Sequence, residues 1–83
     1  MARSKSKLVN VGFDNVVLAE RIVAITAAAP KPIRRLINEA RNVNKLVDAT
    51  NGRKTRSILI TDSDHIILSA SEPKTIAQRI DGT

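Results

Sequence analysis

The chain has 83 residues, no cysteine and a net charge of +6, from 14 lysines and arginines against 8 acidic residues. A chain of this length forms one small domain and buries about 60–65% of its unfolded surface, so association with further copies is a natural source of stability. The composition excludes a disulfide framework and a thiolate metal site. The charge favours a protein that binds a polyanionic partner over a soluble protein that is basic without such a role.

The first half of the chain predicts two strands followed by a helix. Residues 7–12 alternate between apolar and polar side chains, and residues 21–27 form a second β-rich run. The segment between them, residues 16–20, either extends the second strand or makes a helical turn. Pro32 suits the first position of a helix, and apolar residues at helical spacing continue that helix to about Asn44.

The second half of the chain predicts a hairpin meander. Asn51-Gly52 is the strongest short hairpin signal, so we expect residues 46–50 and 55–62 to pair through a type I′ turn. An Asp-rich turn then leads to a third strand of the same meander, residues 65–70. Both faces of the last two strands are apolar, which predicts central strands that are covered on both sides.

A short helix that begins at Pro73 completes the chain. We expect Ile76, Ala77 and Ile80 to face inward. The order β-β-α-β-β-β-α, without a repeat or a linker, predicts one α+β domain over residues 1–83, with a basic, flexible N-terminus over residues 1–6.

Three cations, Arg53, Lys54 and Arg56, follow the predicted turn at once. In a hairpin, the side chains of Arg53 and Lys54 point to opposite faces, whereas those of Lys54 and Arg56 share one face. Single cations on exposed strands discourage aggregation, but three within four residues favour a ribbon that contacts phosphates.

Three further arginines are candidates for the same site. Arg34 and Arg35 lie on the solvent face of the first helix, where they form either an ordinary solvated surface or secondary phosphate contacts. Arg21 stands just before an apolar strand. The residues around Arg21 leave two interpretations open. It either forms an ion pair with Glu20 or Asp14, or it contributes to binding of the polyanionic partner.

Other functions find less support in the residues. The single aromatic residue, Phe13, is interpreted as part of the core, which disfavours stacking of single-stranded nucleic acid. The segment "DSDH", residues 62–65, holds two carboxylates and the one histidine, but Asp-Ser-Asp between strands is ordinary turn chemistry. We therefore predict no enzyme, no catalytic residue, no metal, no cofactor and no small-molecule substrate. Without a signal peptide or a membrane-length apolar run, the cytoplasm is expected.

Five segments together resemble the RemA-like family, small bacterial regulators of biofilm and extracellular-matrix genes. They are KLVNVGFDNVV, AERIVAI, PIRRLINEAR, LVDATNGRKTRSILITDSDHIILSA and EPKTIAQRI, and they cover about residues 7–80. The resemblance implies a nucleoid-associated transcription regulator with a LytTR-like fold that binds and wraps duplex DNA as a ring-shaped homo-oligomer. The DNA-binding arginines of the family fall on Arg21 and Arg53, with Lys54 where a second arginine is usual and Asn51 where a tyrosine is frequent.

In this interpretation, the cations at residues 53, 54 and 56 have no acidic partner within the protein, because their partner is phosphate. Repetition of the predicted hairpin tip around a ring holds many such tips near one duplex. Two alternatives stay open, an RNA-binding module and a general nucleoid-type protein that compacts DNA.

Overall fold

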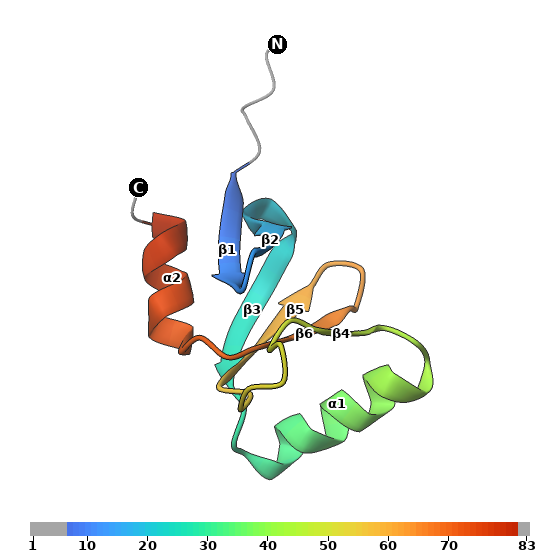
Figure 1. Ribbon diagram of the computed structural model, residues 1–83. Coiled ribbons are helices and arrows are strands. Elements are labelled where there is room, and N and C mark those ends of the chain that lie inside the picture. The colour runs from blue at the N-terminus through green and yellow to red at the C-terminus, as the bar shows by residue number, and fades with distance from the viewer. Residues whose placement is uncertain (1–6, 82–83) are drawn as a thin grey trace.

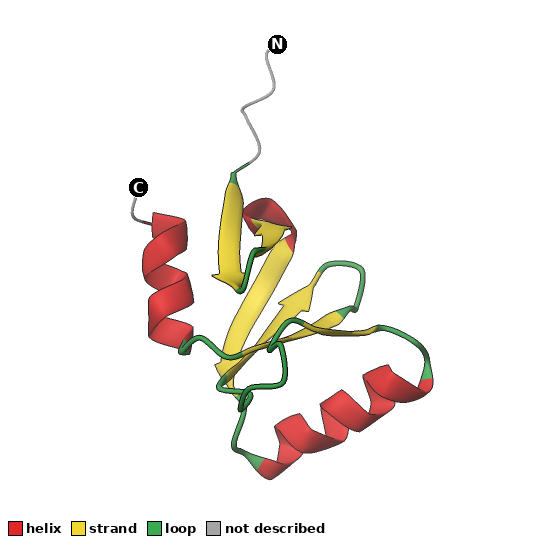
Figure 2. Ribbon diagram, viewed as in Figure 1, coloured by secondary structure: helices red, strands yellow, loops and turns green. Residues whose placement is uncertain are grey.

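The computed structural model describes residues 7–81, and these form two sheets and two α-helices (Figures 1 and 2). In chain order the elements are β1 (Leu8–Gly12), β2 (Asn15–Leu18), the 3-10 helix η1 (Ala19–Arg21), β3 (Ile22–Ala27), α1 (Lys31–Asn42), β4 (Leu46–Asp48), β5 (Ser57–Thr61), β6 (Ile66–Ser69) and α2 (Pro73–Asp81). The predicted α+β class is confirmed. Residues 16–20, which the sequence left open, supply most of a separate strand, β2, and part of the helical turn η1. Three strands and not two therefore precede α1, and the predicted order β-β-α-β-β-β-α is wrong in this respect, because residues 15–18 pair with β1 and do not extend β3. The predicted basic segment over residues 1–6 lies outside the described residues.

The larger sheet has four strands in the order β3-β5-β6-β4, and β1 pairs with β2 in a separate antiparallel sheet. Strands β5 and β6 are antiparallel neighbours at the centre, as expected for two strands that are apolar on both faces. Strand β4 lies at the edge and runs parallel to β6, with Leu46 opposite Ile66 and Asp48 opposite Leu68. The predicted pairing of residues 46–50 with 55–62, and hence the three-stranded meander, is wrong.

The turn that predicted this hairpin nevertheless forms. The Arg53 N–H donates to the Thr50 carbonyl at 3.0 Å, and Asn51 and Gly52 have positive φ angles of 54° and 82°, as a type I′ turn requires. Strand β4 is only three residues long. Strand β5 gains far more burial between β3 and β6 than it could beside β4 at an edge, so tertiary burial overrides the local turn signal.

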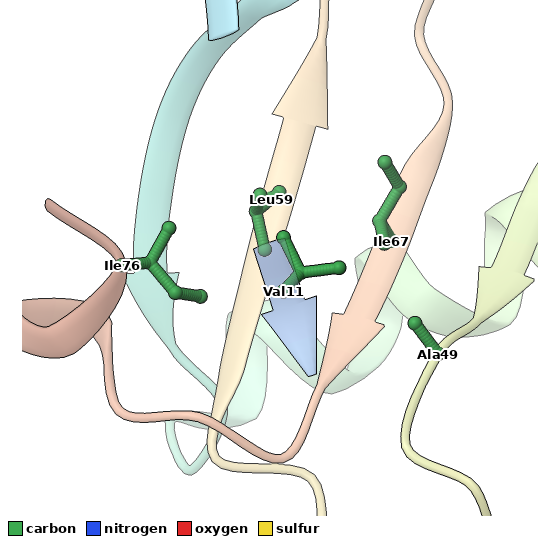
Figure 3. Close-up of a cluster of buried hydrophobic side chains, with 5 residues drawn as sticks. All are labelled: Val11, Ala49, Leu59, Ile67 and Ile76. Carbon is green, nitrogen blue, oxygen red and sulfur yellow. The ribbon is translucent and has the colours of Figure 1, made fainter. Parts of the chain in front are cut away.

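The four-stranded sheet is covered on both faces. Figure 3 shows Val11, Ala49, Leu59, Ile67 and Ile76 converging on the face that carries β1 and α2. Helix α1 covers the other face, where its Ala40 joins a buried cluster with Ile58, Ile66 and Leu68. The successive residues of β5 therefore alternate between two cores, which explains why both faces of that strand are apolar.

Helix α2 contributes a narrow contact to the core. Ile76 is fully buried and Ile80 packs at the margin of the cluster, as predicted. Ala77 is exposed, so its predicted inward orientation is wrong. It lies about 100° around the helix from Ile76, and one face of a nine-residue helix is all that reaches the sheet.

Helix α1 begins at Lys31, so Pro32 occupies its second position and not the predicted first position. Proline is tolerated there because the N–H groups of the first turn have no partner within the helix. The helix ends at Asn42, two residues before the predicted end. The chain turns away because Asn44 adopts a φ of 61° while the Lys45 N–H donates to the Ala40 carbonyl at 2.8 Å. This Schellman arrangement satisfies a carbonyl at the end of the helix and directs the chain into β4.

Candidate nucleic-acid interface

The loop between β4 and β5 presents the three predicted cations, and Asp48 anchors it. The Asp48 carboxylate accepts hydrogen bonds from the Thr50 hydroxyl at 2.6 Å and the Thr50 N–H at 2.9 Å. These two bonds, the hydroxyl first, lower the pKa of Asp48 below its ordinary value, and Arg41 adds a smaller effect. Since Thr50 is buried and its carbonyl binds the Arg53 N–H, the carboxylate fixes the turn that carries Arg53.

Arg53, Lys54 and Arg56 line one open hollow of about 430 Å³, together with Phe13 and Ser71. The predicted alternation, with Arg53 and Lys54 on opposite faces, is wrong because these residues belong to a loop and not to a strand. The hollow lies where the β1–β2 turn meets the loop before β5. Loop geometry thus gathers three charges that a hairpin would have divided between two faces.

Lys54 and Arg56 also line a second hollow, of about 550 Å³, with Arg34 of α1 on its other side. Residues Ala27–Ala29 and Ile37 contribute small apolar walls to it. Of the two helix arginines proposed from sequence, Arg34 therefore lines the hollow and Arg35 does not. We call Arg34, Arg53, Lys54 and Arg56 the basic cluster.

The members of the basic cluster differ in their partners within the protein. Arg56 forms an ion pair with Glu72, with 3.0 Å between Nη1 and Oε2, so the expectation that it has no acidic partner is wrong. Lys54 has no ion pair within residues 7–81, and Arg53 stacks over the ring of Phe13. Both partners of the Arg56 pair are about half exposed, and such a pair contributes only about 0.2–1 kcal/mol. A phosphate can compete with it.

Phe13 was missed by sequence reasoning, which placed it in the core. The residue is 43% exposed and lies in the turn between β1 and β2. The signal was present in the sequence, because Gly12, Asp14 and Asn15 surround Phe13 with turn-forming residues. A position inside a tight turn predicts exposure, whatever the side chain.

Arg21 lies at the opposite end of the sheet from the basic cluster. It forms an exposed ion pair with Asp62, with 2.7 Å between Nε and Oδ1, and its carbonyl accepts a hydrogen bond from the Asp62 N–H. Strand β3 separates it from the loop that carries Arg53, a span of about 17 Å for five residue steps (Figure 1). Arg21 thus has an acidic partner, but that partner is Asp62 and neither Glu20 nor Asp14, the two that the sequence suggested. The structure does not bring Arg21 together with Arg53 in one subunit.

The "DSDH" segment forms the turn between β5 and β6. The Ser63 hydroxyl lies 2.7 Å from Nδ1 of His65, and Asp64 adopts a φ of 68° in the turn. The side chain of Asp62 is engaged by Arg21. Within residues 7–81, no group of three or more histidine, cysteine or acidic side chains could hold a metal ion. The geometry of the segment matches the predicted turn.

Fold and site together define a small α+β domain whose charged surface suits an anionic partner. The family model described as "RemA-like: Extracellular matrix regulatory protein A-like" matches residues 8–80, and the chain belongs to this family. Within residues 7–81, no helix is long and apolar enough to cross a membrane.

Relatives from several bacteria carry the name "Putative regulatory protein". The chain is 58% identical over 74 residues to one from Brevibacillus brevis, covering 89% of this chain and 86% of the relative. It is 54% identical to one from Shouchella clausii, covering 89% and 85%, and 58% identical to one from Moorella thermoacetica, covering 89% and 81%. By name, the family is one of regulatory proteins and not of enzymes.

Proposed function

We propose that this protein is a DNA-binding transcription regulator of extracellular-matrix genes that holds duplex DNA against the basic cluster. One observation carries the proposal: Lys54 and Arg56 line both of two neighbouring hollows. Arg53 lines one of these hollows and Arg34 lines the other, so the four cations form one continuous basic surface. Binding of a duplex backbone depends on charge and shape more than on stacking, and four neighbouring cations suit closely spaced phosphates. The family name supports the choice of matrix genes.

The regulator is proposed to act in the cytoplasm as a ring-shaped homo-oligomer that wraps the duplex. One subunit neutralises about two to four phosphates, which is weak binding, and repetition around a ring raises the effective concentration of such surfaces. The two edges of the four-stranded sheet carry exposed valines, Val23 on β3 at 63% and Val47 on β4 at 46%. Two different apolar edges suit a head-to-tail contact that can close. In such a ring, Arg21 can reach the same duplex although it is remote from the basic cluster of its own subunit.

The test is duplex-DNA binding as a function of salt, with the mass of each protein measured in the same buffers. Arg53→Ala is expected to lower the slope of log K against log salt by about 0.9 per subunit, and the affinity about fivefold at 0.15 M salt. Lys45→Gln removes one charge beside the turn between β5 and β6, at the end of the sheet remote from the basic cluster, and serves as the control. If both variants lost binding equally at unchanged mass, binding would follow net charge and not the basic cluster.

A second candidate, an RNA-binding module, is favoured by the exposed ring of Phe13. An aromatic side chain beside a cation is the usual platform for an unstacked base. Competition between duplex DNA and single-stranded RNA of equal length separates the two candidates. Preferential binding of the RNA would replace the first proposal with the second.

A further inference from the structure

Phe13 is held in a backbone conformation that phenylalanine rarely adopts. Its φ is 52°, and it stands between Gly12 at 116° and Asp14 at 66°, so three successive residues have positive φ. Bulky side chains avoid this region, and residues that occupy it are concentrated at functional sites. Phe13 is 43% exposed, so burial in the core does not explain why a phenylalanine is held there.

Side chains from several elements fix this turn. The Asn10 carboxamide oxygen accepts a hydrogen bond from the Gly12 N–H at 2.7 Å, and the Asn15 amide nitrogen donates to the Gly12 carbonyl at 2.9 Å. The buried hydroxyl of Ser69 donates to the Val11 carbonyl at 2.7 Å and so ties the turn to the central sheet. The backbone that carries Phe13 is therefore tied to the central sheet.

The ring lies against one member of the basic cluster. The guanidinium carbon of Arg53 is 5.1 Å from the centroid of the Phe13 ring, within the range of a cation–π contact. The backbone of Arg53 is fixed independently, by the turn that Asp48 anchors through Thr50. The long side chain of Arg53 is thus held at both ends, on the rim of the hollow that it shares with Lys54 and Arg56.

We infer that Phe13 is a positioning residue, whose ring holds the Arg53 guanidinium ready to meet a phosphate of the duplex. An arginine side chain that is free in solution loses rotamer entropy when it binds, and ordering it beforehand lowers that cost. This role rests on the proposed function and adds to it, because it assigns one residue the task of ordering another. It also gives a reason for keeping a strained aromatic residue on the surface.

The variants Phe13→Asn and Phe13→Trp distinguish the effect of the aromatic ring on DNA binding from the effect of the turn conformation. Asparagine tolerates positive φ, so Phe13→Asn removes the ring from a turn that still forms, whereas Phe13→Trp keeps a cation–π partner. Phe13→Asn is expected to weaken duplex binding about twofold to fivefold per subunit, the value of an exposed cation–π contact. The salt slope stays unchanged because the charge of Arg53 remains. Phe13→Trp is expected to bind as the wild type does.

Duplex binding by Phe13→Asn, Arg53→Ala and the double variant completes a double-mutant cycle. If Phe13 acts through Arg53, Phe13→Asn costs nothing in the Arg53→Ala background. A loss of the same size in both backgrounds would overturn the inference and show that the ring contacts DNA itself. No loss in either background would overturn it too.

The stack is also measurable without DNA. Proton NMR of the free wild type should show the Arg53 side-chain protons shifted upfield by the ring, and this shift should vanish in Phe13→Asn. Absence of the shift in the wild type overturns the inference while leaving the proposed function intact. A wild type that shows the shift but binds no duplex at low salt overturns the proposed function, and with it the phosphate-binding role of the stack.

Discussion

Nη1 of Arg56 lies 3.0 Å from Oε2 of Glu72, so one cation of the basic cluster already has a carboxylate partner in the free protein. Glu72 immediately precedes α2 and lines the same hollow as Arg34 and Lys54. The carboxylate therefore occupies a position next to the proposed phosphate site. Any phosphate that binds Arg56 has to compete with it.

Removal of this carboxylate charge should strengthen duplex binding. Glu72→Gln frees Arg56, and since an exposed ion pair is worth about 0.2–1 kcal/mol, the affinity is expected to rise about 1.5-fold to fivefold per subunit. The salt slope should steepen by up to about 0.9. Glu39→Gln on α1 makes the same change in net charge outside the basic cluster, and a gain of equal size in that variant would contradict the competition.

The two adjacent arginines of α1 should differ in importance. Arg34 lines the hollow with Lys54 and Arg56, whereas Arg35 does not, although the two residues are chemically identical. In salt titrations of duplex binding, Arg34→Ala is expected to lower the slope by about 0.9 per subunit, and Arg35→Ala to leave it nearly unchanged. A wild-type slope in Arg34→Ala would place Arg34 outside the interface, and an equal drop in both variants would contradict the predicted difference between the two arginines.

Local sequence patterns predicted most elements of this fold, because turn signals and hydrophobic periodicity act over a few residues. The turn at Asn51-Gly52 formed as predicted, but the partner of β4 did not follow from it, since strand order depends on burial of β5 from both sides. The same distinction holds for the site. Adjacent cations were visible in the sequence, whereas the approach of Arg34 and Glu72 to them depends on helix packing. The contact of Arg53 with Phe13 spans 40 positions, and no local pattern predicts it.

The carboxylate of Asp48 should make stability depend on pH in acid. Its hydrogen bonds from Thr50 lower its pKa below the ordinary value of 3.8, so the folded state binds this proton less readily than the unfolded chain. The stabilisation is fully present above pH 3.8 and is lost as the pH falls through the lowered pKa. Asp48→Asn is thus expected to reduce Tm by roughly 2–5 °C at neutral pH, and by much less at about pH 2.5.

Thermal unfolding monitored by circular dichroism across this pH range measures the effect. Thr50→Ser keeps the hydroxyl donor to Asp48 and should retain the pH dependence of the wild type. A Tm difference between wild type and Asp48→Asn that is the same at both pH values would show that the charge of the carboxylate is not what anchors the turn.

The exposed valines at the two sheet edges provide the test of the proposed ring. Val23 is the extra residue in a β-bulge of β3, between Ile22 and Ala24, and such a bulge discourages pairing of the strand edge with another chain. Contact with a neighbour therefore has to use side chains. Val23→Glu and Val47→Glu are each expected to reduce the mass in solution to that of a monomer, because either charge would be buried in the contact.

A head-to-tail contact makes a further and sharper prediction for a mixture of these two variants. The Val23→Glu variant keeps an intact β4 edge, and the Val47→Glu variant keeps an intact β3 edge. These two edges can still meet, so the mixture should form dimers that neither variant forms alone. Ala77→Glu places the same charge on the exposed face of α2 and should leave the wild-type mass unchanged. If one variant dissociated the assembly and the other did not, the contact would join like edges, and subunits joined in that way form pairs and not rings.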